Sequence, residues 1–172
     1  MTKATGPLYS VHFRRRREKK TDYEKRLALL KSGKTRLVVR KTNRFVYAQF
    51  IDFREAGDAV VAAACSAELG EFGFAGKCNT PSAYLTGMLA AKRAAAAGVR
   101  EFVLDIGLQS ASKGAVVFAA LKGAVDAGLK APFSPDKLPS EERISGKHLA
   151  GDASARFAEA KGKVAAFQPP RK

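Results

Sequence analysis

The sequence has 172 residues, 46% of them hydrophobic, which is enough for one domain with extensions. Its formal net charge is +15, and residues 1–50 hold 15 lysines and arginines against only 3 acidic residues. Charge concentrated in this way indicates a polyanionic partner, with nucleic acid first, and no apolar run reaches the roughly 20 residues that span a bilayer.

Residues 1–20 have no period that could bury a face. They include seven basic residues, four of them in the run Arg14–Arg17. Because like charges repel and little apolar surface is present to offset ordering entropy, we expect an extended arm that is disordered when alone. Tyr9 and Phe13 lie among these charges, and their rings either stack on unpaired bases or pin the arm to its own domain.

A short helix is predicted over about residues 22–32. Thr21 and Glu24 have the spacing of a capping box, with the threonine hydroxyl at the N-cap. Tyrosine and leucine side chains form an apolar stripe at helical spacing, and Gly33 supplies a stop. The basic residues lie off this stripe, so one side of the helix can face phosphate.

Two β-rich runs, residues 35–41 and 45–53, predict a hairpin. Asn43 lies in the connecting turn and tolerates the left-handed conformation. The tip then bears four polar or basic residues, Arg40, Lys41, Asn43 and Arg44. A third strand is predicted over residues 59–64, which completes an antiparallel meander.

The second half of the core alternates between helix and strand. One helix opens at Thr80-Pro81, a strand covers residues 99–106, and a helix covers 114–127, with the hydroxyl-rich segment 110–114 as its cap. The strand is almost continuously apolar, so we expect it to be buried and parallel to a neighbour. Asp105 is expected to bond the following loop, and Gly107 to occupy a strained or close-packed turn.

After residue 130 three prolines make the chain irregular, and an alanine-rich helix over 152–166, interrupted by Gly162, precedes a basic, Pro-containing tail over 168–172. We predict an α/β fold with a mixed β-sheet and packed helices in the order α-βββ-α-β-α. The predicted organisation is a basic RNA-binding arm over 1–20, a core domain over 21–130 and a C-terminal extension over 131–172.

Several motifs stand in order between about residues 9 and 150. They are Arg-Arg-Arg-Arg-Glu-x-Lys-Thr-Asp-Tyr (14–23), Lys-Arg-Leu (25–27), Arg-Leu-Val-Val-Arg-Lys-Thr-Asn-Arg (36–44), Ala-Tyr-Leu-Thr-Gly (83–87), Leu-Asp-Ile-Gly-Leu (104–108), Val-Phe-Ala-Ala-Leu-Lys-Gly-Ala-Val-Asp-Ala-Gly-Leu (117–129) and Ile-Ser-Gly-Lys-His-Leu-Ala (144–150). As a set, they resemble the universal large-subunit ribosomal protein that carries 5S rRNA, numbered eighteen in bacteria and archaea and five in eukaryotes. The arginine-rich opening is of the archaeal and eukaryotic type.

The resemblance implies a structural, non-enzymatic protein of the large ribosomal subunit in the cytoplasm. It implies binding to 5S rRNA in the central protuberance, beside 23S-type rRNA, a second 5S-binding ribosomal protein and other central-protuberance proteins. Lys19 stands where the family often has glycine, so the turn there departs from the family while its charge rises. The RNA-binding residues that the resemblance and this added charge imply are Arg14, Arg15, Arg16, Arg17, Lys19, Lys20, Tyr23, Arg26, Arg36, Arg40, Lys41, Thr42, Asn43 and Arg44.

The alternative of an enzyme has little support in the residues. The glycine-rich segment 70–79 lacks the spacing of a phosphate-binding loop, and His12 and His148 have no predicted partner. Three aspartates, at 52, 58 and 105, would be needed for a metal-dependent nuclease, but they are better explained as strand ends and turn caps. Cys65 and Cys78 lack Cys-x-x-Cys spacing, so we predict a reduced protein with no cofactor and no metal.

A second alternative is a generic module that binds structured RNA, or an RNA chaperone, without preference for 5S rRNA. It would use the same basic residues, because phosphate neutralisation carries no sequence information. Equal affinity for 5S rRNA and for unrelated structured RNA would distinguish it from the first hypothesis.

Overall fold

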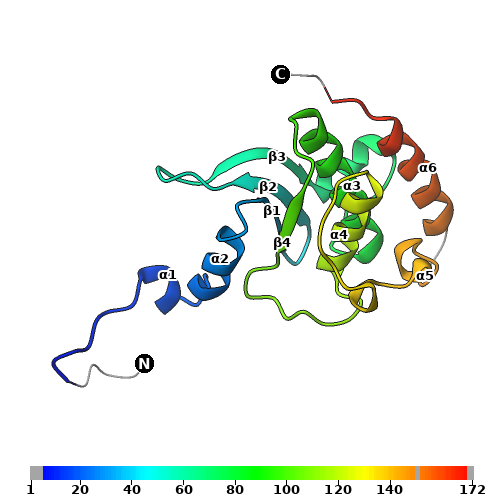
Figure 1. The fold of residues 1–172 in the computed structure, drawn as a ribbon. Coiled ribbons are helices and arrows are strands. Elements are labelled where there is room, and N and C mark those ends of the chain that lie inside the picture. The colour runs from blue at the N-terminus through cyan, green and yellow to red at the C-terminus, as the bar shows by residue number, and fades with distance from the viewer. Residues whose placement is uncertain (1–5, 150–151, 170–172) are drawn as a thin grey trace.

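The domain is built on a four-stranded mixed sheet in the order β3-β2-β1-β4 (Figure 1). A computed structural model describes residues 6–149 and 152–169, so the ends of the predicted arm and tail lie outside the described residues. The strands are β1 (Thr35–Lys41), β2 (Val46–Asp52), β3 (Ala59–Cys65) and β4 (Phe102–Asp105). The three N-terminal strands pair antiparallel, and β4 runs parallel to β1, which confirms the predicted hairpin, meander and parallel strand.

The helices in chain order are α1 (Arg14–Arg17), α2 (Tyr23–Leu30), α3 (Thr80–Ala96), α4 (Val116–Asp126), α5 (Glu141–Ile144) and α6 (Ala153–Ala166), with 3-10 segments η1 (Ser66–Phe72) and η2 (Pro135–Lys137). Figure 1 shows α3 and α4 on one side of the sheet, α6 outside them, and α1 with the arm projecting from the opposite side. This arrangement is the predicted α/β fold with packed helices.

Side chains on β1 alternate between the two faces of the sheet. Leu37 and Val39 are fully buried in the core beneath α3 and α4, together with Phe50 of β2. Arg36 and Arg40 therefore project from the other face, because successive side chains of a strand point in opposite directions. That second face is covered only in part, by α2, and it carries the polar site described below.

Helices α3 and α4 approach closely because glycine stands at their crossing. A Cβ on Gly87 of α3 would lie 2.1 Å from the carbonyl oxygen of Ala120 in α4. No larger residue fits without separating the helices. The closely packed helices α3 and α4 form a rigid layer that covers one face of the sheet. The polar site lies on the opposite face.

Three local expectations were wrong. The N-cap of α2 is Asp22 and not Thr21, because the Asp22 carboxylate accepts from the backbone N–H groups of Glu24 and Lys25. The segment 110–114 does not cap α4, whose N-cap Ala115 forms no side-chain bond. Helix α6 continues through Gly162, because Phe157, Ala160 and Val164 bury one of its faces against the core and outweigh the low helix propensity of glycine.

Candidate nucleic-acid interface

The arginine run of the arm forms one helical turn, α1, where an extended chain was expected. The backbone N–H groups of Arg16 and Arg17 donate to the carbonyl of Phe13, at 3.0 and 3.1 Å. All four arginines of α1 are exposed. The turn ends at Lys19, whose φ of +51° lies in the left-handed region that favours glycine. The backbone therefore takes the left-handed conformation at this position although the residue is lysine. The four exposed arginines lie on one helical turn.

Two contacts attach the arm to α2. The rings of Phe13 and Tyr23 lie 5.2 Å apart between centroids, and Arg15 Nε donates to Thr21 Oγ1 at 2.9 Å. Phe13 remains 72% exposed despite this contact. Of the two roles considered for this ring, the structure shows attachment of the arm to its own domain.

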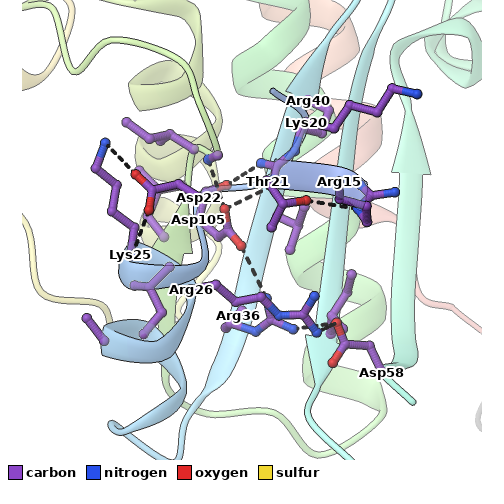
Figure 2. Close-up of a pocket in the computed structure, with 17 residues that line it drawn as sticks. Arg15, Lys20, Thr21, Asp22, Lys25, Arg26, Arg36, Arg40, Asp58 and Asp105 are labelled. Carbon is purple, nitrogen blue, oxygen red and sulfur yellow. Dashed lines mark hydrogen bonds and ion pairs between the residues drawn. The ribbon is translucent and has the colours of Figure 1, made fainter. Parts of the chain in front are cut away.

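A pocket of about 480 Å³ opens between the arm, α2 and the free face of the sheet (Figure 2). Apolar side chains of α2, β1, β2 and β4 form part of its wall. Its charged lining residues are Arg15, Lys20, Lys25, Arg26, Arg36 and Arg40 with Asp22, Asp58 and Asp105. The pocket therefore has an excess of positive charge, and it brings together predicted residues from the arm, α2 and β1.

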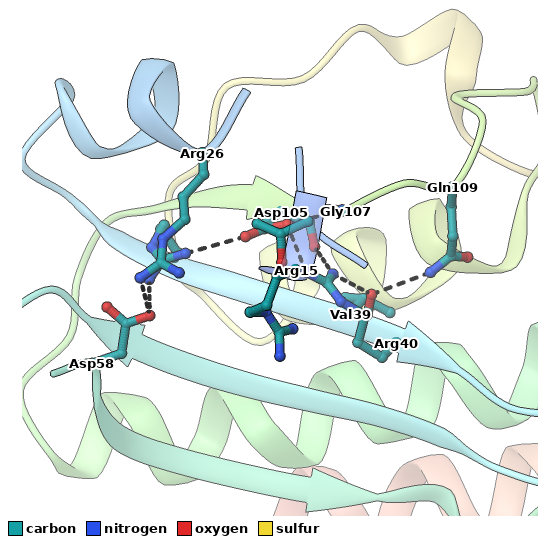
Figure 3. A network of polar contacts seen from close by, with 10 residues as sticks. Arg15, Arg26, Val39, Arg40, Asp58, Asp105, Gly107 and Gln109 are labelled. Atoms are coloured by element: carbon teal, nitrogen blue, oxygen red, sulfur yellow. Dashed lines mark hydrogen bonds and ion pairs between the residues drawn. The ribbon is translucent and has the colours of Figure 1, made fainter. Parts of the chain in front are cut away.

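Arg36 lies at the floor of this pocket and is only 3% exposed. Its guanidinium donates to Asp58 Oδ2 at 2.8 Å and to Asp105 Oδ2 at 3.2 Å, and Arg26 donates to the same Asp58 oxygen at 2.8 Å (Figure 3). A buried arginine is stabilised only when its donors are paired in this way. The structure gives Arg36 an internal, supporting position, and a direct contact of Arg36 with RNA stays a prediction.

Arg40 lies at the end of β1, where the same carboxylate holds it. Its guanidinium donates to Asp105 Oδ1 at 2.9 Å and to two main-chain carbonyls, those of Val39 and Asp105, at 2.9 and 2.8 Å. Asp105 Oδ1 also accepts from the N–H of Gly107 at 2.9 Å, which confirms that Asp105 bonds the following loop. Gly107 has φ +63° and would place a Cβ 2.9 Å from Arg40 Cζ, so the predicted strained, close-packed turn is confirmed.

The tip of the β1–β2 hairpin presents Lys41, Thr42, Asn43 and Arg44, all exposed. The Thr42 hydroxyl accepts from the N–H of Phe45 at 3.0 Å, and the Thr42 N–H donates to the Phe45 carbonyl at 2.8 Å. These bonds fix the turn. Asn43 does not take the left-handed conformation, since among the described residues Lys19 alone combines a side chain with a positive φ.

Many of the predicted cations have no carboxylate partner. Arg14 and Lys20 pair with Glu18, Lys25 with Asp22, and Arg26 with Asp58. Within residues 6–149 and 152–169, no ion pair involves Arg15, Arg16, Arg17, Lys19, Lys41 or Arg44. These side chains extend from α1, its following turn and the hairpin tip, and they remain available to phosphate groups.

Sequence reasoning missed the supporting role of three residues. Asp58 and Asp105 were expected only to close strands and turns, and Gln109, whose side chain donates to the Val39 carbonyl at 3.3 Å, was not singled out. The alternation of arginine with Leu37 and Val39 along β1 was the available signal. It indicates that Arg36 and Arg40 share a polar face, and a buried arginine requires an acidic partner.

The N-cap of α2 makes the start of this helix sensitive to acid. The backbone N–H of Lys25, foremost among several contacts, holds the pKa of Asp22 below its usual value of 3.8. Because the pKa of Asp22 is lower in the folded protein, its ionised carboxylate stabilises the helix at any pH above the usual pKa. This contribution is lost as the pH falls through the lowered pKa. We expect the first turn of α2 to fray on acidification, seen as loss of helical α-carbon chemical shifts as the pH falls below the usual value of 3.8 toward the lowered pKa of Asp22.

Asp22→Asn is the matched variant for this test, because it keeps an oxygen acceptor and removes the titrating group. Its shifts should lose their pH dependence in this turn, and Thr21→Ala should behave as the wild type. An identical acid transition in Asp22→Asn would show that another group controls the helix start.

The described part of the chain offers little for other chemistries. None of its helices has the length and apolar character needed to cross a membrane. Between residues 6 and 169, apart from 150–151, no group of three or more histidine, cysteine or acidic side chains is arranged to hold a metal ion.

Comparison with known proteins agrees with the character of this surface. The family model described as "Ribosomal large subunit proteins 60S L5, and 50S L18" matches residues 8–99 and 95–134. The chain belongs to this family. It is 58% identical over 152 residues to large ribosomal subunit protein uL18 of Korarchaeum cryptofilum, covering 87% of this chain and 77% of that protein. It is 56% identical to the uL18 protein of Methanoculleus marisnigri, covering 89% and 88%, and 51% identical to that of Methanospirillum hungatei, covering 95% and 94%.

Membership of this family gives the chain a role. It is a structural protein of the large ribosomal subunit and not an enzyme, and its partners are ribosomal RNA and other ribosomal proteins. The exposed cations of α1 and the hairpin tip are suited to such a partner, because phosphate groups are neutralised by lysine and arginine.

Proposed function

We propose that this chain binds 5S rRNA and helps to attach it in the central protuberance of the large subunit. Its neighbours there would be 23S-type rRNA, a second 5S-binding ribosomal protein and other central-protuberance proteins, in the cytoplasm. The family membership and the ordered motifs of residues 14–23 and 36–44 support this proposal. Its generic alternative, binding to structured RNA without preference, shares the charge but not those motifs.

The observation that carries the proposal is the separation of cations by role. Arg16, Arg17 and Arg44 are exposed and have no ion pair among the described residues, whereas Arg36 is buried in a network with Asp58 and Asp105. The exposed set can release counterions from RNA, which supplies much of the affinity. The buried set holds β1 in relation to β4 and so fixes the position of the hairpin tip.

Shape would supply the preference for one RNA. The hairpin tip is held by its own hydrogen bonds, and α1 is attached to α2 by the Phe13–Tyr23 and Arg15–Thr21 contacts. Two cationic elements at fixed positions favour an RNA whose phosphates match their spacing, and folded RNA with unpaired loops provides such surfaces.

The test is filter binding of the full chain to purified 5S rRNA across a salt series, with transfer RNA as the competitor. We expect tight binding that persists in excess transfer RNA and weakens linearly on a plot of log affinity against log salt concentration. Binding abolished by transfer RNA would favour the generic module, and the family would then describe the fold and the ribosomal setting without the 5S preference.

A further inference from the structure

The guanidinium of Arg40 is held at its edges. Nη1 donates to the carbonyls of Val39 and Asp105, and Nη2 donates to Asp105 Oδ1. Arginine has five N–H donors in one plane, so these three bonds leave two. Because the bonds come from the main chain of β1 and β4 and from a buried carboxylate, the plane of the group is fixed by the sheet itself.

One flat face of the guanidinium lies against Gly107. A Cβ at position 107 would be 2.9 Å from Cζ, 3.0 Å from Nη2 and 3.2 Å from Nε. The central carbon is the nearest of the three atoms, so the approach is onto the face of the group and not onto its edge. Glycine is favoured at this position for two reasons: the backbone has a positive φ, and a Cβ would collide with the guanidinium.

The opposite face is the part of the guanidinium left for a ligand. The Arg40 side chain remains 44% exposed, and it lines the pocket shared with Arg15 and Lys20 (Figure 2). The pocket also has apolar lining, including Val38 and Leu104, and its 480 Å³ falls within the roughly 300–1,000 Å³ of small-molecule sites. A flat group that is partly apolar, such as a nucleobase, matches these walls better than a phosphate does.

Phosphate recognition by arginine uses two parallel N–H donors at the edge of the guanidinium. On Arg40 both Nη1 donors and one Nη2 donor are bonded to the protein, which leaves Nε–H and one Nη2–H, whereas no side-chain hydrogen bond or ion pair of Arg16 or Arg17 is formed within the described residues. Stacking on a base uses the face instead, and a delocalised, weakly hydrated cation is suited to it. The geometry thus separates two kinds of contact within one basic surface.

We propose that Arg40 is a fixed platform on which one unpaired base of the bound RNA stacks, with Asp105 and Gly107 as its positioning residues. This inference rests on the proposed function only in taking ribosomal RNA as the ligand. It adds a stacking contact with a base to a surface whose other predicted contacts are with phosphates. It also predicts that the charge of Arg40 matters less than the plane of its guanidinium.

Arg40→Lys tests the proposal because it keeps the charge and removes the plane. Stacking on a base contributes about 1–3 kcal/mol, so affinity for 5S rRNA should fall by about 5- to 150-fold with no change in the salt dependence. Arg54→Lys, at an exposed arginine outside the predicted RNA-binding set, is the matched control and should change affinity by less than about threefold. Melting curves of both variants show whether the fold is kept.

The RNA side of the test identifies the base and separates stacking from a structural effect. Each unpaired nucleotide is replaced in turn by an abasic residue, and binding is measured with wild-type and Arg40→Lys protein. At one position the two losses should not add, because the same contact is removed twice. The abasic RNA alone should also weaken binding of the wild-type protein by a similar factor, which needs no protein variant.

Additive losses at every unpaired position, or full affinity of a folded Arg40→Lys variant, would overturn the inference. Its failure is distinguishable from failure of the proposed function. If transfer RNA displaces 5S rRNA, the 5S preference fails, but the same cycle can be run on whichever structured RNA the chain binds.

Discussion

Replacing Asp105 with alanine is expected to lower the free energy of unfolding by about 3–5 kcal/mol. The Asp105 carboxylate is buried and accepts from Arg36, Arg40 and the N–H of Gly107. Without it, Arg36 would keep only Asp58 as a charged partner, and its Nε is already a buried donor with no acceptor within the described ranges. An uncompensated charge in the interior costs far more than an exposed one.

Urea unfolding followed by circular dichroism measures this loss, and Asp136→Ala is the matched control. Asp136 is exposed in η2, so its removal should change stability by no more than about 0.5 kcal/mol. If Asp105→Ala cost as little as the control, solvent would have to reach Arg36 in the folded state. The network would then not be what holds β1 against β4 on the polar face.

The strands could be predicted because their signals are local. Residues 35–41 and 45–53 are rich in β-branched or aromatic residues, and the apolar run at 102–104 follows a helix, which predicts a buried parallel strand. The structure confirms the meander and the pairing of β1 with β4. The turn at Gly107 was also predictable, because glycine stands just after the end of this apolar strand.

The site could be predicted only in part, because its organising contacts are long-range. The bond from Arg36 to Asp105 joins residues 69 positions apart, and the bond to Asp58 spans 22. Composition shows an excess of arginine but not which arginine is neutralised inside the protein. The N-cap was missed for a different reason: Thr21 and Asp22 are adjacent cap formers, and the hydroxyl of Thr21 is taken by Arg15.

The buried ion-pair network and the exposed cations have different roles: the network holds the fold, and the exposed cations are available to RNA. Arg36 and Asp58 hold the sheet and α2 together, because Arg26 of α2 shares the Asp58 carboxylate. The arm is in turn attached to α2, so its position depends on the same buried charges. A change in the network should therefore alter both stability and RNA affinity, whereas a change in α1 should alter affinity alone.

Replacing Arg14, Arg15, Arg16 and Arg17 together with alanine should weaken 5S rRNA binding and leave the fold intact. If each arginine meets a phosphate, the slope of log affinity against log salt concentration should fall by roughly 3–4 units, since each neutralised phosphate contributes about 0.7–0.9. All four side chains are exposed, and α1 buries no residue, so the melting temperature should not move.

A matched control removes the same charge from elsewhere on the surface. Four exposed arginines outside the first 50 residues serve for this: Arg54, Arg100, Arg143 and Arg156. That variant has the same net charge as the arm variant, so a general electrostatic effect would change both equally. We expect its salt slope to stay within about one unit of the wild type. An unchanged slope in the arm variant would mean that the arginine run does not touch RNA, and the affinity would then have to come from the hairpin tip and the pocket.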